Sequence, residues 1–255
     1  VKRWRMLGKT LRPLPEKWHG LKDIEERFRK RYLDILMSTE SRGKFLLRSK
    51  MIQAIRGILS ADGFLEVETP TLQPLYGGAS AEPFTTHHNV LDADLYLRIS
   101  DELYLKRLLI GNIPKVYEIY KAFRNEGIDV THYPEFTMVE FYESYGTAET
   151  QMKRTESMLG EVAKQVLGKK IFTYNGNKID FGKAFKRTTF FSVLKQYALI
   201  LNPETATREE LVLKAQQLGV SVGTPDSKEK IMDNIYKKAC RPKIIQPTFI
   251  TDYPA

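Results

Sequence analysis

Hydrophobic residues recur every three or four positions along several stretches of the chain. This spacing places them on one face of a helix, and it predicts amphipathic helices over residues 21–36, about 40–62 and 148–168. The same pattern predicts two shorter helices over residues 208–218 and 227–239. Each of these helices needs a partner surface that covers its apolar face.

Hydrophobic and polar residues alternate in the segments between these helices, as they do in half-buried strands. The longest alternation covers residues 116–126 and 135–144, which predicts a hairpin with a long polar loop. Shorter strands are expected at residues 64–70, about 95–99 and 244–253. The mixture predicts an α+β fold class, with an antiparallel sheet flanked by helices.

Local signals add detail to this outline. The string Asn175-Gly176-Asn177 lies between two short strand-like runs and predicts a tight hairpin turn. Further helices are expected to begin near Ser100 and to cover residues 188–199. Residues from about 202 to 240 are expected to form a helical insertion, after which the chain returns to the sheet.

The composition is that of an ordinary globular protein, with 42% hydrophobic and 28% charged residues among 255. No apolar stretch approaches the roughly 18 residues that a membrane helix needs, so no membrane partner is expected. The start of the sequence lacks the apolar run of a secretory signal. The single cysteine, Cys240, fits a reducing compartment, so a cytoplasmic location is expected.

The charge is concentrated at one end of the chain. The protein has 40 basic and 31 acidic residues, a net charge of +9. Residues 1–50 hold 15 of the basic and 6 of the acidic residues, so the rest of the chain is neutral. A basic segment of this kind is typical of a polyanion partner such as a nucleic acid, or of a solvated helix face.

The candidate chemistry lies on the long predicted hairpin. Because side chains alternate between the two faces of a strand, each strand presents one set of residues together. These are Glu118, Tyr120, Ala122, Arg124 and Glu126 on the first strand, and Phe136, Met138, Glu140 and Tyr142 on the second. If the two faces coincide, an arginine, several carboxylates and aromatic rings converge on one surface.

Such a surface is suited to two kinds of ligand. Arg124 can hold a phosphate through its forked guanidinium group, and Phe136 offers a flat face for a planar base. Glu140 and Glu102 can bind a cationic group, and His132 can reach a phosphate from the loop. The simpler alternative is that Arg124 and Glu140 form an exposed cross-strand ion pair, and that Glu102 only complements a helix dipole.

Other familiar motifs are missing from the sequence. It contains no phosphate-binding loop with a glycine-rich lysine motif and no GxGxxG motif, so any nucleotide must bind by other means. The pair His87-His88 has no companion at metal-binding spacing, and Cys240 is expected to be a buried, small apolar residue.

Several strings resemble those of a known enzyme family. The string FRNE at residues 123–126, followed after eight residues by EFTMVEFY at residues 135–142, resembles the second signature motif of class II aminoacyl-tRNA synthetases. The helix, strand and Pro70 over residues 40–70 resemble their first, dimer-forming motif. Further strings narrow the resemblance to the bacterial type of the lysyl-tRNA synthetase family: RPLPEKWHG at 12–20, GGASAEPF at 77–84, YLRI at 96–99 and ELYLK at 102–106.

The resemblance implies roles for particular residues. Arg124 would be catalytic and bind the ATP α-phosphate. The ATP-binding residues would be Arg124, Asn125, Glu126, His132, Tyr133 and Phe136, and the lysine-binding residues would be Gly78, Glu102, Glu140 and Tyr142. The implied reaction is ATP-dependent activation of L-lysine to lysyl-adenylate, followed by transfer to the 3′ end of tRNA(Lys). The implied assembly is a homodimer formed through residues 40–70.

The sequence also departs from the family pattern. Tyr133 stands where the family usually has asparagine, and no glycine-rich segment leading to an arginine follows residue 182. We therefore expect residues 21–255 to be a partial catalytic domain, incomplete at the C-terminus and without the third class II motif. Residues 1–20 would be the end of an OB anticodon-binding domain and a linker. Magnesium is expected in the full-length enzyme, with protein ligands that lie outside this chain.

Two alternatives remain open at the level of sequence. One is a relative that lysylates a protein such as an elongation factor, although residues 12–20 resemble the joint to an OB domain and argue against it. The other is a non-catalytic, dimerising relative. The missing third motif favours it, and the retained Arg124, Glu126, Glu102 and Glu140 argue against it.

The missing third motif leads to a first prediction. We expect the isolated chain to have little or no adenylation activity, because no clamp for the γ-phosphate follows residue 182. Lysine-dependent exchange of pyrophosphate into ATP measures this activity, and exchange at a near-normal rate would overturn the prediction.

Overall fold

The computed structural model describes residues 2–15, 21–129 and 131–254. The chain divides into two compact units, Val1–Arg56 and Gly57–Ala255, and each is described by itself. Residues 16–20, part of the linker expected from the sequence, lie outside the described residues.

The first unit contains two short helices and most of a long one. The helix predicted over residues 21–36 is two helices, α1 (Ile24–Arg29) and α2 (Arg31–Met37), because Lys30 leaves the helical conformation with φ −111° and ψ 49°. One non-helical residue barely changes the spacing of the apolar positions, so the sequence pattern does not reveal the break between the two helices. The helix α3 (Thr39–Ala61) agrees with the prediction for about residues 40–62.

A buried carboxylate holds the short helices together. Asp34 is almost fully buried and accepts hydrogen bonds from Arg27 Nε at 2.7 Å and from Arg31 Nη1 at 2.5 Å. The bond from Arg27 is the main reason that the pKa of Asp34 is lowered to about 2. Asp34 therefore remains ionised, and its bond to Arg27 connects α2 to α1 across the break at Lys30.

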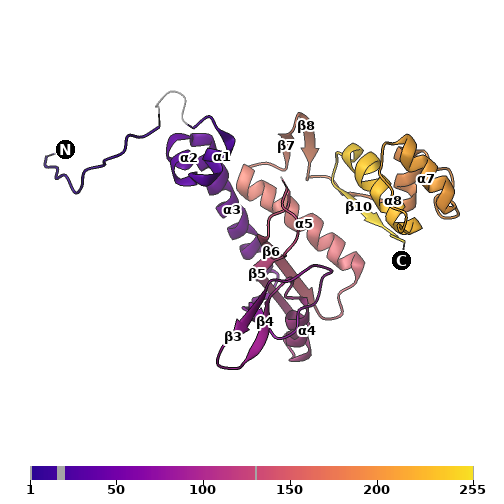
Figure 1. Cartoon of the computed structure of the whole chain (residues 1–255), viewed down its shortest axis with the longest axis horizontal. Coiled ribbons are helices and arrows are strands. Elements are labelled where there is room, and N and C mark those ends of the chain that lie inside the picture. Colours follow the sequence, from indigo (N-terminus) through magenta and orange to yellow (C-terminus); the bar gives the residue numbers. More distant parts are fainter. Residues whose placement is uncertain (1, 16–20, 130, 255) are drawn as a thin grey trace. The chain divides into compact units, whose positions relative to one another are not determined.

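The centre of the second unit is the predicted hairpin (Figure 1). Strands β5 (Lys115–Phe123) and β6 (Glu135–Glu143) form nine antiparallel pairs, from Lys115 opposite Glu143 to Phe123 opposite Glu135. The first strand ends three residues earlier than predicted. Beyond Phe123 the backbone N–H of Asn125 donates to Glu82 O at 2.8 Å, so the chain turns away from the hairpin.

Short strands accompany this hairpin. The strand predicted over residues 64–70 is only β1 (Leu65–Glu66), which pairs with β5 in parallel. A separate antiparallel sheet has the order β2 (Leu72–Gln73), β4 (Ala93–Leu97) and β3 (Thr85–His88). Helices and antiparallel pairs are thus mixed in the described residues, as the α+β prediction requires.

Two helices of the second unit begin near the sheet strands. The helix α4 (Glu102–Ile110) follows β4 and matches the helix expected near Ser100. The helix α5 (Ala148–Leu167) begins at the capping box of Thr147 and ends at Gly168, which has a φ of 71°. Arg154 of α5 donates to Glu143 of β6 at 2.9 Å, which ties this helix to the hairpin.

The predicted tight hairpin is present. Strands β7 (Ile171–Tyr174) and β8 (Asn177–Asp180) pair antiparallel on either side of Asn175 and Gly176. These two residues have φ values of 47° and 77°. Two successive positive φ values are what a type I′ turn requires, and they explain the asparagine and glycine at these positions.

The C-terminal part forms a small helical cluster beside a parallel strand pair. Strand β9 (Lys186–Thr189), which the sequence pattern missed, pairs in parallel with β10 (Thr248–Thr251). The helix expected over residues 188–199 is α6 (Phe190–Val193) followed by a π-helical turn over Leu194–Ala198.

Between β9 and β10 the chain forms α7 (Arg208–Gln217) and α8 (Lys228–Ile235), followed by a π-helical turn over Tyr236–Cys240 and a 3₁₀ turn over Arg241–Lys243. The capping box predicted at Thr207 is present at the start of α7. The apolar faces of these elements share one buried core, which includes Phe190, Leu211, Ile231, Ile235 and Cys240.

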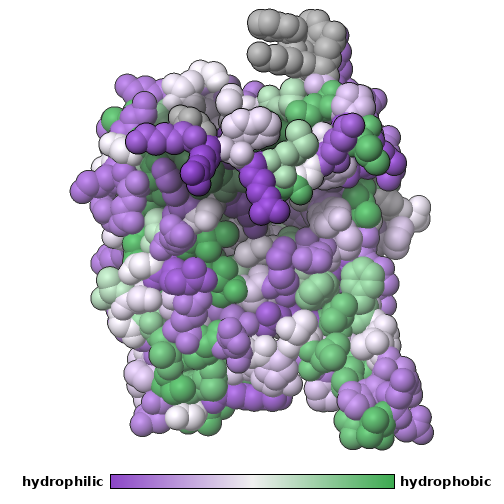
Figure 2. Space-filling view, turned by 90° about the vertical axis from the view of Figure 1, so that its left-hand side faces the viewer, coloured by the Kyte–Doolittle hydropathy of each residue, from purple (hydrophilic) through white to green (hydrophobic). Residues whose placement is uncertain are grey.

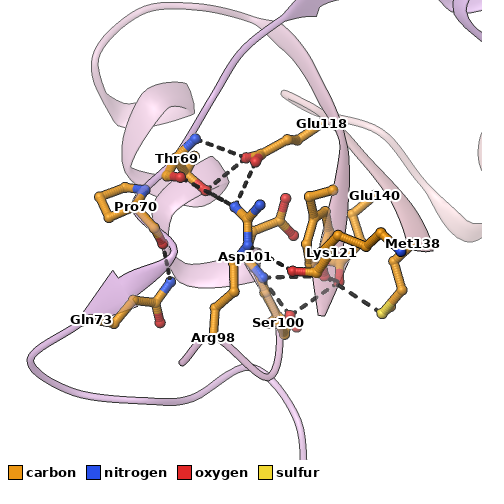
Figure 3. Close-up of polar contacts among 12 residues, drawn as sticks. Thr69, Pro70, Gln73, Arg98, Ser100, Asp101, Glu118, Lys121, Met138 and Glu140 are labelled. Atoms are coloured by element: carbon orange, nitrogen blue, oxygen red, sulfur yellow. Dashed lines mark hydrogen bonds and ion pairs between the residues drawn. The ribbon is translucent and has the colours of Figure 1, made fainter. Parts of the chain in front are cut away.

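A buried ion pair connects three segments near the hairpin (Figure 3). Arg98, just after β4, donates from Nη1 to Glu118 Oε1 of β5 at 2.6 Å, and both side chains are under one-tenth exposed. The backbone N–H and hydroxyl of Thr69 donate to the other oxygen of Glu118, at 3.0 and 2.7 Å. Arg98 Nε also donates to the carbonyl of Lys121 at 3.0 Å. The pair therefore fixes the segment after β1 and the end of β4 against β5.

This ion pair yields a prediction about stability. Replacing Glu118 by Gln leaves Arg98 charged and buried without its counterion, which typically costs about 3–5 kcal/mol. The free energy of unfolding, measured with a chemical denaturant, is expected to fall by that amount. The matched control is Glu135→Gln, which breaks the half-exposed pair between Lys121 and Glu135 and should cost less than about 1 kcal/mol. Equal losses in the two variants would contradict this assignment.

Candidate active site

The pairing of β5 with β6 places the predicted functional side chains on one surface. Glu118 lies opposite Glu140, Tyr120 opposite Met138, and Ala122 opposite Phe136. Residues directly opposite each other in an antiparallel pair project to the same face. The two strand faces therefore coincide for the residues within β5 and β6, which meets the condition stated from the sequence.

Glu140 is the centre of a network of hydroxyl groups. Its Oε1 accepts hydrogen bonds from Tyr120 at 2.6 Å and from Ser100 at 3.1 Å, and its Oε2 accepts from Tyr142 at 2.9 Å. Burial, supported by the nearby negative charge of Glu140, raises the pKa of both tyrosines well above the ordinary value, so both stay protonated and donate. Glu140 thus accepts three hydroxyl hydrogen bonds through its two carboxyl oxygens.

The simple ion pair between Arg124 and Glu140 is absent from the part of the chain that the structure describes. The reason is the register of the hairpin, because Glu140 faces Glu118 while Arg124 lies beyond the last pair of β5. The backbone N–H of Arg124 donates instead to Pro134 O at 2.8 Å.

The start of α4 closes this surface on one side. Gly78 has a φ of 83°, and a Cβ atom placed there would lie 2.8 Å from Glu102 Cβ and 2.9 Å from Ser100 Oγ. Only glycine fits this close approach without displacing its neighbours. Glu102 also forms an ion pair with Lys106 one turn along the helix. The structure thus brings the predicted lysine-binding residues Gly78, Glu102, Glu140 and Tyr142 into one neighbourhood, with Ser100 between Gly78 and Glu140.

Five of the six residues predicted to bind ATP line a hollow of about 270 Å³ at the end of the hairpin. Arg124, Glu126, Gly127, Thr131, His132, Tyr133 and Phe136 line it. The guanidinium carbon of Arg124 lies 5.3 Å from the centre of the Phe136 ring. Among the described residues, Arg124 Nε is buried and has no hydrogen-bond partner, so it retains an unused donor. Asn125 does not line the hollow and joins the loop of Glu82 through its backbone.

An aspartate organises the loop that carries His132. Asp129 accepts hydrogen bonds from the backbone and hydroxyl of Thr131, at 2.6 and 2.8 Å, and lies 2.8 Å from His132 Nδ1. The hydrogen bonds from Thr131 are the main reason that the pKa of Asp129 is well below its ordinary value. Asp129 therefore stays ionised and orients the imidazole ring of His132 at the hollow.

Asp101 is a further residue of this region, and its position in the sequence suggests only an acid in the first turn of a helix. Its side chain is fully buried, caps nothing at the start of α4, and has no hydrogen-bond partner for either carboxyl oxygen within residues 21–129 and 131–254. Burial first, and then the charges of Glu140 and Glu118, raise its pKa to about 8. A single sequence holds no signal that separates such a buried acid from an exposed one at the same helical position.

The described side chains include no cluster suited to a metal ion. Over residues 2–15, 21–129 and 131–254, no group of three or more His, Cys, Asp or Glu side chains is arranged to hold a metal ion. His87 lies 3.0 Å from Asp94 in the neighbouring strand. In the same described part of the chain, no helix is long and apolar enough to cross a membrane.

Comparison with known proteins identifies relatives over the whole chain. A family model described as "tRNA synthetases class II (D, K and N)" matches residues 23–255. The lysine–tRNA ligases of Moorella thermoacetica and of Roseiflexus sp. RS-1 are 46% and 47% identical over 254 residues, which cover 100% of this chain and 52% of each relative. The lysine–tRNA ligase of Shewanella loihica is 42% identical over 266 residues, with the same coverage. The chain spans about half the length of these curated relatives.

The close approach at Gly78 leads to a prediction. Gly78→Ala is expected to lower the free energy of unfolding by about 1–2 kcal/mol, because alanine is strained at a positive φ. The clash of its Cβ atom with Glu102 and Ser100 should lower it by a further ~1–3 kcal/mol. Gly176→Ala is the control, because Gly176 has a similar φ of 77° but no atom within 4 Å of its Cβ position. Chemical denaturation measures both variants, and equal losses would show that the crowding at Gly78 has no energetic effect.

Proposed function

Because the chain belongs to the class II tRNA synthetase family (D, K and N), we propose that its protein is a lysine–tRNA ligase. The protein would activate L-lysine with ATP to form lysyl-adenylate and pyrophosphate, and would then transfer the lysyl group to the 3′ end of tRNA(Lys). The observation that carries the proposal is the hydroxyl-bonded Glu140, which lies on the same strand as the aromatic wall of the hollow, Phe136. The names of the relatives support the same activity.

The charge of the surface favours a cationic amino acid. Lysine carries two ammonium groups, and Glu102 and Glu140 offer carboxylates for them, with Tyr142 and the backbone of Gly78 alongside. An acidic amino acid would need free cations instead. Arg98, which lies near this surface, is already neutralised by Glu118 and bonded to Thr69 and Lys121, so it offers no unpaired charge.

The hollow suits the nucleotide. The adenine ring would stack on Phe136, and Arg124, which lines the hollow, would bind the α-phosphate through its forked guanidinium group. Glu126 and His132 would contact the ATP from the sides of the hollow, together with Tyr133. Asn125 does not line the hollow, so its part in ATP binding would be to hold the chain in place through its backbone bond to Glu82.

The chemical step then depends on positioning and charge. The lysine carboxylate attacks the α-phosphorus in line with the leaving pyrophosphate, and Arg124 stabilises the negative charge that develops on the phosphoryl oxygens. A 3′-terminal hydroxyl of the tRNA next attacks the lysyl carbonyl carbon and releases AMP. Magnesium would accompany ATP, but the described residues offer no ligand set for it, so no step is assigned to it.

The surface supports the proposed partners. Several large apolar residues of α3 and β1 are exposed, which fits a homodimer formed through residues 40–70: Phe45, Leu46, Leu47, Met51 and Leu65. Figure 2 shows groups of hydrophobic residues on the face it displays, separated by hydrophilic ones. The basic excess of residues 1–50 suits a tRNA backbone. A role in translation also agrees with a cytoplasmic location.

The proposed domain organisation is that of the sequence analysis. Residues 1–20 would be the end of an OB domain and a linker, and residues 21–255 would be part of the catalytic domain, with an insertion at about 202–240. The helices α7 and α8, which lie between β9 and β10 in the chain, are compatible with that insertion.

The proposed function is tested at Arg124. In the full-length context, Arg124→Ala is expected to reduce lysine-dependent exchange of pyrophosphate into ATP by about 10²–10³-fold or more, because a preorganised donor to the developing charge is lost. Lys121→Ala is the matched control, since Lys121 lies three residues earlier and forms only a half-exposed pair with Glu135.

Two results would contradict the proposal. Unchanged exchange in the Arg124 variant would refute the role of this arginine. Exchange in the wild-type protein that depends on an amino acid other than lysine would refute the proposed substrate.

A further inference from the structure

Asp101 is a buried carboxyl group that the proposed reaction does not use. Its side chain is fully shielded from solvent, and neither of its oxygens has a hydrogen-bond partner within residues 21–129 and 131–254. In the view of Figure 3 its carboxyl group lies between Glu118 and Glu140. An unpaired buried polar group costs free energy, so its retention beside a binding surface requires an explanation.

The surroundings of Asp101 offer few compensating charges. The elements packed around it contribute Arg98 and Ser100 before α4, Glu102 at the start of α4, Glu118 and Tyr120 on β5, and Glu140 and Tyr142 on β6. Arg98 is the cation among them, and its charge is balanced by Glu118. Glu102 has its own partner in Lys106. Glu140 is therefore left without a cationic partner, and Asp101 lies beside it.

The hydroxyl donors in this region bond to Glu140 and not to Asp101. The hydroxyl groups of Tyr120, Tyr142 and Ser100 donate to it, and Tyr120 accepts a hydrogen bond from the backbone N–H of Asp101 at 3.3 Å. Of the two neighbouring acids, Glu140 thus has three donors and Asp101 has none for its carboxyl oxygens. The carboxyl group of Asp101 is fully buried, lacks a donor and lies near the carboxyl groups of Glu140 and Glu118, so without a bound cation it is expected to hold a proton.

We propose that Asp101 is a specificity-determining residue of the lysine site, and that it releases its proton to solvent when the side-chain ammonium group of lysine is bound at Glu140. This inference rests on the proposed function. One cation enters and one proton leaves, so the net charge of the site is conserved and no covalent bond between heavy atoms changes. A ligand with a neutral side chain cannot replace the proton, and the pocket would then keep Asp101 neutral.

The first test is the number of protons released when lysine binds. Titration calorimetry of the wild-type protein, in the full-length context and in buffers of different ionisation enthalpy, is expected to show release approaching about one proton per lysine near pH 6–7. The lysine dissociation constant should fall by up to about tenfold for each pH unit as the pH rises toward 8. Norleucine, which has the same chain length without the side-chain ammonium group, should release no proton.

The variants locate the proton. Asp101→Asn keeps the size of the side chain but cannot ionise, so proton release and the pH dependence of lysine binding should both be lost. Asp94→Asn is the matched control, because Asp94 is an exposed aspartate of β4 paired with His87, and it should behave as the wild type does. Lysine binding without proton release in the wild type would overturn this inference and leave the proposed function intact. Absence of lysine binding at every pH would overturn both.

A second measurement needs no ligand. The pKa of Asp101 is raised to about 8, so the stability that this group contributes is fully present below its ordinary pKa near 3.8 and is lost as the pH rises through 8. The free energy of unfolding of Asp101→Asn should therefore rise relative to the wild type between pH 5 and pH 9, whereas that of Asp94→Asn should not. A constant difference between Asp101→Asn and the wild type would show that Asp101 is already ionised in the empty site, which would overturn the proposal.

Discussion

The nine-pair register of β5 and β6 is the constraint on which the site depends. Side chains in a strand alternate with a period of two, so a slip of one residue would move Glu140, Met138 and Phe136 to the opposite face. The same register places Glu118 opposite Glu140 and leaves Arg124 beyond the last pair. This register thus separates the carboxylate end of the surface from the arginine and phenyl ring at the hollow, as the proposed reaction between two bound ligands requires.

The buried Arg98–Glu118 pair fixes neighbouring chain segments against β5 and so stabilises the strand that sets this register. Glu118 accepts hydrogen bonds from the backbone N–H and the hydroxyl of Thr69, and Arg98 donates to the carbonyl of Lys121. The pair therefore connects β5 to segments that are distant from it in the sequence. A buried ion pair adds little net stability compared with apolar residues, but breaking it leaves a charge that nothing compensates. Its structural value therefore lies in fixing one arrangement of the segments around β5.

The sequence predicted the elements and residues that periodicity and local chemistry determine, and missed those that depend on the three-dimensional environment. The hairpin, α3, α5 and the Asn175-Gly176 turn followed from spacing and turn chemistry. The break at Lys30 and the strand β9 did not, because the first leaves the apolar spacing intact and the second exists only through pairing with β10, about sixty residues later. Among the site residues, Glu140 stood out by its strand face, whereas the burial of Asp101 results from the packing of β5 and β6 against the start of α4.

The charge of Arg98 bears on our proposal that the site binds a cationic amino acid, because this arginine lies near the surface that carries Glu140. If Arg98 were unpaired, it would offset Glu140 and the surface would be close to neutral. Glu118 removes that effect by pairing with Arg98 at 2.6 Å, at the cost of placing another carboxylate near Asp101. Burial first, and then the charges of Glu140 and Glu118, raise the pKa of Asp101, so this second carboxylate favours the protonated form that our proposal requires. The ion pair that fixes the fold and the buried acid of the proposed lysine site are therefore parts of one electrostatic arrangement.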